Sequence, residues 1–393
     1  MPQFKRVGVT MKILHLLSNW KWTERSELVI DLAASQARLG HEVWFICGKP
    51  PEGDESVPDV SLCASQKGLQ NVIALPEMTK HLKISYIFRG VKKLREIISS
   101  IKPDVIHCHM RNDHLLAGLA AGKKKNVPMI RSAYNPDHLA RDLRSRWCYR
   151  SFTDGLIVVR EKVRQSALSR NTFSGKIEVV PPAVDLERFS PDREITSTVE
   201  FGPLEDCFVA GVVSRIRQTR RLDIPLEVIS RLKGQYPRLR LLIVGHGRPG
   251  AYEKVIEKPA ADLGIQDRLI RAGYCRGDDL VAAYRQMHVL LYPMPGSDKT
   301  CRTVREALAA GVPVIAPDME FLPELIEDGH NGYLASQSPE GFAPLLQKLL
   351  DSPETLHKLS QQALTSARER FGLQRQAEKT LIFYKEVYQS LYG

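Results

Sequence analysis

Hydrophobic and polar residues alternate along the chain in blocks that predict strands and helices in turn. Short apolar runs are followed by stretches in which apolar residues recur every three or four positions, as they do on one face of a helix between Ile84 and Ile101. We expect strands over residues 11–18, 42–47, 104–109, 128–133 and 155–159, and then over 208–214, 239–245, 269–274, 289–293 and 313–317. This alternation predicts parallel sheets covered by helices.

The two series of strands are separated by a proline-rich, polar stretch at residues 181–206, which is typical of a linker. The chain has 393 residues, which is long for a single hydrophobic core. We therefore expect two doubly wound α/β domains.

Composition and charge narrow the class of protein. With 43% hydrophobic and 26% charged residues the chain is typical of a globular protein, and no apolar run approaches the ~20 residues that span a bilayer. The seven cysteines include no Cys-x-x-Cys pair, so neither a disulfide framework nor a zinc ribbon is indicated, and a reducing cytoplasm fits. A net charge of +11 indicates an anionic partner: a phospholipid surface, a nucleotide, a phosphorylated glycan or nucleic acid.

Residues 294–334 contain the most informative motif. Asp298 lies in a loop rich in Gly, Ser and Thr, and Glu306 follows eight positions later, where we expect a helix to begin. Such a loop can accept hydrogen bonds from sugar hydroxyls through its acid and can hold phosphate oxygens through backbone N–H groups. The alternative is a loop aspartate and a glutamate favoured by the helix dipole.

This segment resembles the donor-site motif of the retaining GT-B glycosyltransferases of family 4. In that family two acidic residues eight positions apart contact the donor sugar and the ribose. The patterns E-A-x-A-x-G-x-P-V and P-E-x-I-x-x-G-x-N-G follow these residues, and this chain nearly matches both patterns. The resemblance implies that Glu306 holds the ribose and Asp298 the sugar, although the family usually has Glu at the first position. Thr300, in the same loop, is an expected donor contact.

The segment VVSRIRQTRRLD, residues 212–223, is similar to the family's G-R-x-x-x-x-K-G loop, which clamps the donor diphosphate. Arg215 matches the Arg and Arg220 the Lys, an exchange that keeps the positive charge. Arg221 stands where the family has glycine, which places the loop geometry in question. A solvated basic turn is the alternative.

Two glycine-containing strand ends resemble further donor-binding positions of the family. Gly245 and Gly247, in LIVGHG, would let backbone approach the nucleotide. The next strand ends at Gly273 and Tyr274, as in the family's x-G-Y. Many tight strand-to-helix turns carry a G-x-G, and the motif alone is therefore weak evidence. Its position between the two stronger motifs is what supports the assignment.

In the first half, DVIHCH resembles the family's D-V-x-H-x-H strand end, and His109 corresponds to the active-site histidine. Strand alternation puts His107 and His109 on one face, at the carboxyl end where open α/β sheets bind ligands. Two packed strand histidines are the alternative. A His-x-His pair can also bind metal, but no third ligand is apparent and the chain has no Asp-x-Asp, so we expect none.

The first half also departs from the family. Arg25 and Ser26 occupy the positions of a glycine pair before the first helix. Tyr134 stands where a second histidine is common, and Arg160 where the family has serine. Because these positions belong to the acceptor side, they imply an unusual acceptor or lost activity.

The resemblance implies the GT-B fold, in which two Rossmann-like, doubly wound domains face each other across a cleft. We expect an acceptor-binding domain at residues 11–185, a nucleotide-sugar-binding domain at 186–370, and a helix at 371–393 that crosses back to the first domain. The expected catalytic set is His109, Arg215, Arg220, Asp298 and Glu306, in which the two arginines stabilise the leaving diphosphate and His109 positions the sugar or acceptor.

The implied activity is that of a metal-independent, retaining hexosyltransferase in polysaccharide or lipopolysaccharide biosynthesis. It would move a sugar from a nucleotide diphosphate to a glycan or a lipid-linked acceptor. The alternatives are a sugar-nucleotide epimerase of the same fold and, because of the lost glycines, a non-catalytic sugar-nucleotide-binding homologue.

The expected partners follow from the same resemblance and from the charge. We expect no cofactor, a UDP-sugar in preference to a GDP-sugar as substrate, and no nucleic acid. We expect a cytoplasmic protein, peripheral on the inner membrane, with the basic segments 81–102 and 141–150 attracted to anionic lipid by roughly 1 kcal/mol per basic residue near the surface. A solvated basic face is the alternative.

Overall fold

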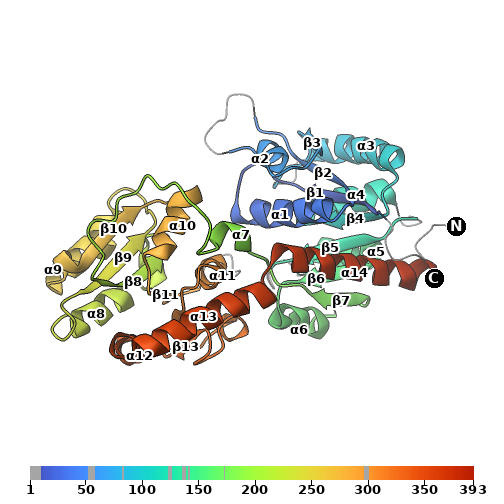
Figure 1. Ribbon diagram of the computed structural model, residues 1–393. Helices are drawn as coiled ribbons and strands as arrows, with labels where there is room; N and C mark the ends of the chain where they lie inside the picture. The colour runs from blue at the N-terminus through green and yellow to red at the C-terminus, as the bar shows by residue number, and fades with distance from the viewer. Residues whose placement is uncertain are drawn as a thin grey trace. The chain divides into compact units, whose positions relative to one another are not determined.

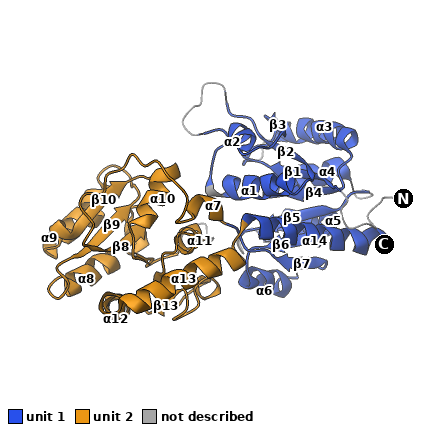
Figure 2. Cartoon of the chain, in the orientation of Figure 1, with its two compact units in different colours: residues 1–183, 373–393 blue, residues 184–372 orange. Residues whose placement is uncertain are grey.

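The computed structural model of the chain divides into two compact units (Figure 2). Unit 1 comprises residues 1–183 and 373–393, and unit 2 comprises residues 184–372. The residues that the structure describes are 10–51, 58–81, 84–122, 126–134, 139, 142–171, 173–295 and 301–393. Asp298 and Thr300 of the expected donor loop therefore lie outside the described residues.

Unit 1 is built on a seven-stranded parallel sheet of order β3-β2-β1-β4-β5-β6-β7 (Figure 1). The strands are β1 (Lys12–Leu17), β2 (Glu42–Gly48), β3 (Asn71–Leu75), β4 (Val105–Cys108), β5 (Met129–Ala133), β6 (Gly155–Val158) and β7 (Lys176–Val179). The helices are α1 (Glu24–Arg38), α2 (Val60–Gln66), α3 (Ile84–Ile101), α4 (Arg111–Ala121), α5 (Leu143–Phe152), α6 (Glu161–Ser169) and α14 (Leu373–Tyr392). The strand order reverses between β1 and β4, which is where such sheets bind ligands.

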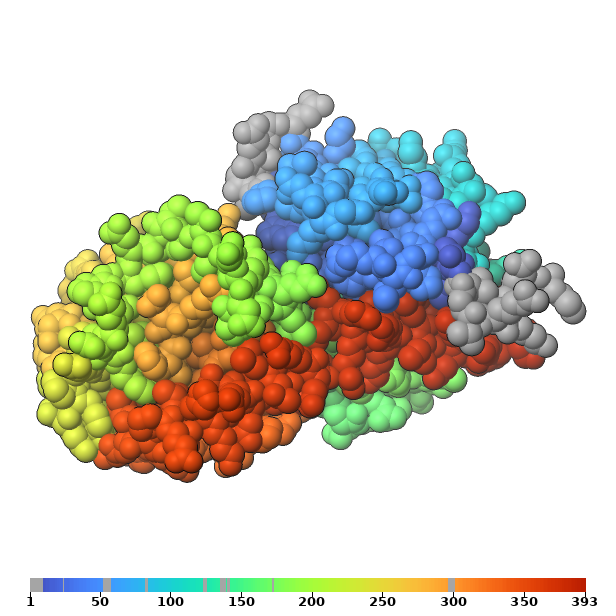
Figure 3. Space-filling model, in the orientation of Figure 1, coloured from blue at the N-terminus to red at the C-terminus, as the bar shows by residue number. Residues whose placement is uncertain are grey.

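Helices cover both faces of this sheet. One hydrophobic cluster joins the sheet to α1, α2, α6 and α14, and a second joins it to α3, α4 and α5. In the space-filling view the residues of α14 (red) lie against those of α1 (blue) (Figure 3). The last helix of the chain is therefore part of the core of unit 1.

Unit 2 is built on a six-stranded parallel sheet of order β10-β9-β8-β11-β12-β13. The strands are β8 (Phe208–Val213), β9 (Leu239–Val244), β10 (Leu269–Gly273), β11 (Val289–Leu291), β12 (Val314–Pro317) and β13 (Gly332–Ala335). The helices are α7 (Leu186–Phe189), α8 (Asp223–Leu232), α9 (Lys258–Asp262), α10 (Gly277–Arg285), α11 (Arg302–Ala309), α12 (Pro339–Asp351) and α13 (Pro353–Arg370). Short turns η2 (Gln218–Arg220), η4 (Gln266–Arg268) and η5 (Leu322–Glu324) and a π-helical segment η3 (Glu253–Glu257) complete the unit.

The expected α/β architecture with two parallel sheets is confirmed, and each strand expected from an apolar run is present. Three strands were not expected: β3, β7 and β13. All three lie at sheet edges, and the residues of β7 and most of β3 are at least partly exposed. Because an edge strand has one neighbour and need not bury both faces, its sequence gives a weaker signal.

One helix boundary was expected in the wrong place. Helix α11 begins at Arg302 and not at Glu306, which lies in its second turn. The first turn of α11 is polar except for Val304, so the apolar run that follows Glu306 does not mark the start of the helix.

Candidate functional site

The first expected cation of the donor clamp follows β8, at the carboxyl edge of the sheet of unit 2. Arg215 is exposed, and its side chain forms no hydrogen bond or ion pair with the described part of the chain. Its guanidinium is thus available to a ligand at this edge.

Arg220 lies in η2, which follows β8 in the same loop. Its Nη1 donates a hydrogen bond to the carbonyl oxygen of Pro295, at 2.8 Å. Pro295 is the last described residue before 296–300, so the relation of Arg220 to Asp298 stays a prediction. The contact joins two elements of the expected donor site that are 75 residues apart.

Arg221 explains how the loop accommodates the missing glycine. Its backbone has φ 53° and ψ 40°, in the left-handed region that favours glycine. Its side chain forms hydrogen bonds from Nε and Nη2 to the carboxylate of Asp223. The loop therefore keeps a glycine-like conformation, and the guanidinium of Arg221 is engaged by Asp223.

The glycines after β9 are required by close packing against the loop after β8. Gly245 has φ 137°, and a Cβ there would lie 1.8 Å from the carbonyl oxygen of Ser214. A Cβ at Gly247 would lie 2.6 Å from the carbonyl oxygen of Ile216. This packing accounts for both glycines without a ligand, so their contact with nucleotide stays a prediction.

Tyr274, which follows β10 and Gly273, offers an aromatic surface at the same edge. Its side chain is 55% exposed. The ring meets His246 edge-on at 4.4 Å between centroids, and the guanidinium of Arg276 lies 4.6 Å from the ring centroid. Gly273 has φ 70°, which lets the strand end turn sharply before this ring.

Glu306 is deeply buried, with 3% of its surface exposed. Its Oε1 accepts a hydrogen bond from Nε of Arg302 at 2.6 Å, and its Oε2 accepts one from the hydroxyl of Tyr284 at 3.0 Å. Burial and this carboxylate raise the pKa of Tyr284 well above its usual value. Within the described residues Glu306 accepts from these two donors, and its contact with a ribose stays a prediction.

A histidine cluster lies in unit 1 where the strand order reverses. His15 of β1 is paired in register with His107 of β4, and His109 follows β4. All three side chains are fully buried. The rings of His107 and His109 lie 4.0 Å apart, and His15 lies 5.2 Å from each.

Hydrogen bonds fix the proton positions at His15 and His109. Because Oε1 of Gln36 can only accept, Nε2 of His15 donates to it at 2.7 Å. With His15 neutral, its Nδ1 accepts from Nε2 of His109 at 2.9 Å, so Nδ1 of His109 accepts from the hydroxyl of Tyr134 at 2.9 Å. The ring nitrogens of both histidines are thus occupied.

The same chain of hydrogen bonds continues through the last helix. Nε2 of Gln36 donates to the hydroxyl of Tyr384 on α14 at 3.5 Å, and this hydroxyl is hydrogen-bonded to Nδ1 of His107 at 2.6 Å. Nε2 of His107 is hydrogen-bonded to Oγ of Ser132 at 2.7 Å. We call this series, from Tyr134 through His109, His15, Gln36, Tyr384 and His107 to Ser132, the histidine chain.

Electrostatics keep these histidines neutral. Burial lowers the pKa of His15 to about 4 and lowers the pKa values of His107 and His109 well below the usual value. The fully buried guanidinium of Arg131 lowers the last two further. Arg131 also opposes the effect of burial on Asp113, whose pKa is nevertheless raised to about 7.

The histidine cluster supplies a third potential metal ligand, His15, that sequence reasoning missed. Nitrogen atoms of His15, His107 and His109 lie within 4.8 Å of one another. Each of these nitrogens is engaged in a hydrogen bond, and the buried charge of Arg131 acts against a cation. The geometry therefore favours a hydrogen-bonded cluster over a metal centre.

The departures from the family pattern gather at this edge of unit 1. Tyr134 follows β5 and bonds to His109, and the guanidinium of Arg25, in the first turn of α1, lies 5.5 Å from the centroid of the Tyr134 ring. Arg160 follows β6, the neighbour of β5, and is 5% exposed. The hydroxyl of Ser26 donates to the carbonyl oxygen of Lys21, so this residue helps form the start of α1.

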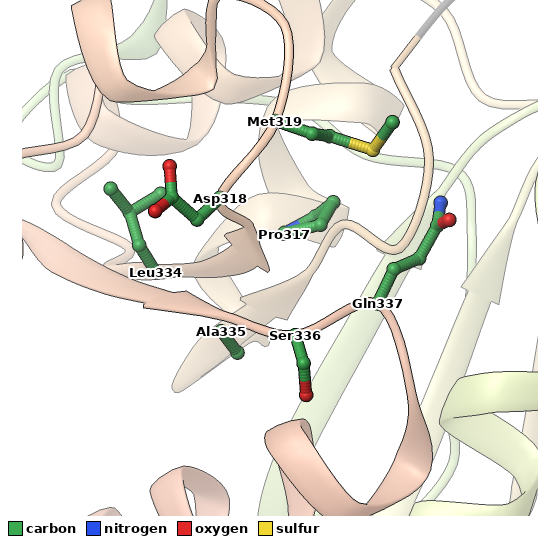
Figure 4. Close-up of a pocket in the computed structure, with 7 residues that line it drawn as sticks. All are labelled: Pro317, Asp318, Met319, Leu334, Ala335, Ser336 and Gln337. Atoms are coloured by element: carbon green, nitrogen blue, oxygen red, sulfur yellow. The ribbon is translucent and has the colours of Figure 1, made fainter.

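A hollow of ≈ 510 Å³ lies at the carboxyl ends of β12 and β13 (Figure 4). It is lined by Pro317, Asp318, Met319, Leu334, Ala335, Ser336 and Gln337. Nε2 of Gln337 donates to the carbonyl oxygen of Pro293 at 2.9 Å, which ties its wall to the loop after β11. Nothing in the sequence pattern indicated this hollow, because it is formed by the ends of two strands that only the sheet brings together.

Comparison with known proteins matches both units to glycosyltransferase families. Residues 26–188 match the model described as Glycosyltransferase Family 4, and residues 197–366 match that of Glycosyl transferases group 1. Two proteins named D-inositol 3-phosphate glycosyltransferase are similar to the chain. That of Stackebrandtia nassauensis is 30% identical over 310 residues, 73% of this chain and 69% of that protein.

Another D-inositol 3-phosphate glycosyltransferase, from Streptomyces bingchenggensis, is 34% identical to this chain over 219 residues. The match covers 53% of this chain and about half of that protein (48%). Among solved structures, Anabaena HepE in complex with UDP has a TM-score of 0.73 and 16% identity, over 96% of this chain and all of that one. The similarity to HepE shows a shared fold.

Proposed function

The chain belongs to the GT-B glycosyltransferases of family 4, and from that premise we propose that it moves a sugar from a nucleotide diphosphate to a glycan or lipid-linked acceptor. We further propose that it is a hexosyltransferase, that the anomeric configuration is retained, and that the product serves cell-surface polysaccharide or lipopolysaccharide synthesis. The observation that supports the proposal most directly is the hydrogen bond from Arg220 to the carbonyl oxygen of Pro295, which joins the loop after β8 to the segment after β11.

The two arginines of unit 2 answer the chief electrostatic demand of this reaction. Breaking the sugar–phosphate bond leaves negative charge on the diphosphate. Arg215 and Arg220, fixed in the loop after β8, would stabilise that charge as it develops. Since two guanidinium groups can supply this stabilisation, we propose a reaction without a metal ion or other cofactor.

The remaining donor contacts are assigned from the same edge of unit 2. Glu306 would accept from the ribose and Asp298 from the sugar, while Thr300 and the backbone at Gly245, Gly247 and Gly273 would contact the nucleotide, with Tyr274 beside the base. A UDP-sugar is preferred to a GDP-sugar, and the UDP bound to HepE, a protein of the same fold, supports this preference.

His109 is assigned an indirect part in the reaction. Its ring is fully buried and both nitrogens are bonded. It would therefore act by holding the hydroxyl of Tyr134, whose side chain is 7% exposed.

We also propose that the protein acts in the cytoplasm, peripherally on the anionic inner membrane. Helices α3 and α5 both pack against α4, so they lie on one face of unit 1. Exposed apolar side chains on these helices are Ile84, Phe88, Leu143 and Trp147, and exposed basic ones are Arg89, Lys92, Lys93, Arg95, Arg144, Arg146 and Arg150. Apolar side chains among cations suit an interfacial surface. Within the described residues, no helix has the length and apolarity needed to span a bilayer.

The experiment is a calorimetric screen with UDP, GDP, ADP, CMP and their sugars, followed by donor turnover with a candidate acceptor. We expect a UDP-sugar to bind, and Arg215→Ala and Arg220→Ala each to reduce turnover by an amount equivalent to roughly 3 kcal/mol of barrier. Arg238→Ala, an exposed arginine elsewhere in unit 2, is the matched control. Binding without turnover would indicate a non-catalytic homologue, and conversion of the sugar-nucleotide itself an epimerase.

A further inference from the structure

Gln337 connects two loops at the carboxyl edge of the sheet of unit 2. It follows β13 by two residues, and its Nε2 donates hydrogen bonds to the carbonyl oxygen of Pro293 at 2.9 Å and to the sulfur of Met294 at 3.0 Å. Because β12 lies between β11 and β13 in the sheet, this side chain spans the carboxyl end of β12. It also lines the hollow described above, together with Pro317 (Figure 4). Gln337 therefore holds the segment that follows β11.

Side chains from two loops supply hydrogen bonds to the segment 293–295. Its two prolines have no backbone N–H, so they are anchored through their carbonyl groups. The carbonyl oxygen of Pro293 accepts from Gln337, in the loop after β13. The carbonyl oxygen of Pro295 accepts from Nη1 of Arg220, in the loop after β8, at 2.8 Å. The two donors thus act on one short segment.

The backbone of this segment is stiff. A proline ring holds φ at about −65°, which applies at Pro293 and at Pro295. Met294, which precedes a proline, is restricted to extended conformations. Few rotations remain between the first and the second proline carbonyl, so the direction of the second depends on that of the first. A displacement at Pro293 is therefore passed on to the carbonyl that accepts from Arg220.

Arg220 depends on this carbonyl for its orientation. Within the described ranges its guanidinium has no carboxylate partner, in contrast to that of Arg221, which Asp223 engages. The position of the Arg220 side chain is thus set by the carbonyl of Pro295, whose own position depends on Gln337.

From these contacts we propose that Gln337 is a positioning residue of the donor site. By holding the carbonyl of Pro293 it fixes the segment 293–295, and the carbonyl of Pro295 then holds the guanidinium of Arg220 where it binds a diphosphate. The part of Arg220 in binding a diphosphate rests on the proposed function, whereas the coupling of Gln337 to Arg220 rests on the contacts alone.

The coupling is tested without a ligand, by hydrogen exchange of the backbone amides in residues 216–224. The N–H groups of Arg220, Arg221 and Ile224 donate to carbonyl groups within this loop, so their exchange reports its opening. Gln337→Met keeps the length of the side chain and removes its N–H donor. We expect exchange in this loop to become about three- to tenfold faster, as the loss of one hydrogen bond would produce. Arg220→Ala should have the same effect.

Three controls separate this coupling from a general loss of stability. Gln235→Met, at an exposed glutamine of the same unit, should leave the exchange unchanged. The amides of α8 and β9 are an internal reference, because weaker packing of the whole unit would raise their exchange as well. Gln337→Glu, which also lacks the amide donor, replaces the methionine variant if that protein does not fold. If residues 216–224 exchange no faster than in the parent, relative to α8 and β9, Gln337 only supports the wall of the hollow and the inference is overturned.

The consequence for the donor site is measured by titration calorimetry with UDP and with inorganic pyrophosphate, a diphosphate without a base. Gln337→Met should weaken both affinities by about three- to tenfold. Because the glutamine acts through the arginine, the double variant Gln337→Met/Arg220→Ala should bind no more weakly than Arg220→Ala alone. Additive losses would overturn the inference. Faster loop exchange together with no affinity in the parent, or with equal affinity in every variant, would instead refute the diphosphate role of Arg220, so the proposed function can fail while the coupling stands.

Discussion

Replacing Tyr384 by phenylalanine tests the histidine chain and the place of the last helix in unit 1. Tyr384 is fully buried, and its hydroxyl is hydrogen-bonded to Nδ1 of His107 at 2.6 Å. Phenylalanine keeps the ring and its edge-on contact with His107 but removes the hydrogen-bond partner of that nitrogen. A buried polar group left unsatisfied costs about 1–3 kcal/mol. Because Gln36 also loses its acceptor, we expect a loss of about 2–3 kcal/mol.

The assay is urea unfolding at pH 7.5 followed by tryptophan fluorescence, which reports unit 1 because all four tryptophans of the chain lie there. For a unit of this size the loss corresponds to a melting temperature lower by roughly 4–10 °C. Tyr392→Phe is the matched control, because Tyr392 lies on the same helix and is 43% exposed. If the two variants unfold at the same urea concentration, the hydroxyl of Tyr384 is not bound as the structure shows.

Three further predictions concern the pH dependence of stability, Arg221 with its left-handed backbone, and the buried carboxylate of Glu306. Because burial lowers the folded-state pKa of His15 from 6.5 to about 4, the stability that its neutral form provides is complete above pH 6.5 and is lost as the pH falls toward 4. His15 alone should account for about 2 kcal/mol of loss between pH 7.5 and pH 5, which urea unfolding at pH 7.5, 6 and 5 would measure and a flat profile would exclude. Arg221→Gly should leave the free energy of unfolding unchanged or raise it by up to about 1 kcal/mol, because removing the strain of the left-handed backbone offsets the loss of the exposed ion pair with Asp223. A loss of stability above that amount, measured by calorimetry, would contradict this account of the loop. Glu306→Gln should weaken the affinity for the nucleotide diphosphate and for the nucleotide sugar alike, by about tenfold or more in titration calorimetry, whereas the exposed control Glu340→Gln should leave both affinities unchanged. A lower melting temperature with unchanged affinity would show that Glu306 serves only Arg302 and Tyr284.

Local sequence was sufficient for the central strands and for the helix of residues 84–101. Strands that are buried on both faces require a run of apolar residues, and such runs are legible without any knowledge of the partners. The family resemblance, carried by residues 294–334 and confirmed by the comparisons, predicted the fold class. The edge strands β3, β7 and β13 were missed because partial exposure relaxes the same requirement.

Sequence alone named His107, His109 and Tyr134 but not what they contact. His15 is 92 residues from His107, and Tyr384 is 277 residues from it. The pairing register of β1 with β4 and the return of α14 to unit 1 bring them together, and neither can be inferred from local periodicity. The family pattern likewise recorded Arg25 as a departure from glycine, and only the tertiary structure brings its guanidinium to 5.5 Å from the centroid of the Tyr134 ring.

The sequence by itself therefore determined which residues are apolar enough to form the sheets and which motifs identify the family. Tertiary structure decided the hydrogen-bond partners and the burial of each polar group. The physical reason is that strand burial depends on a side chain's own hydrophobicity, whereas the pKa and accessibility of His109 or Glu306 depend on neighbours supplied by distant segments of the chain.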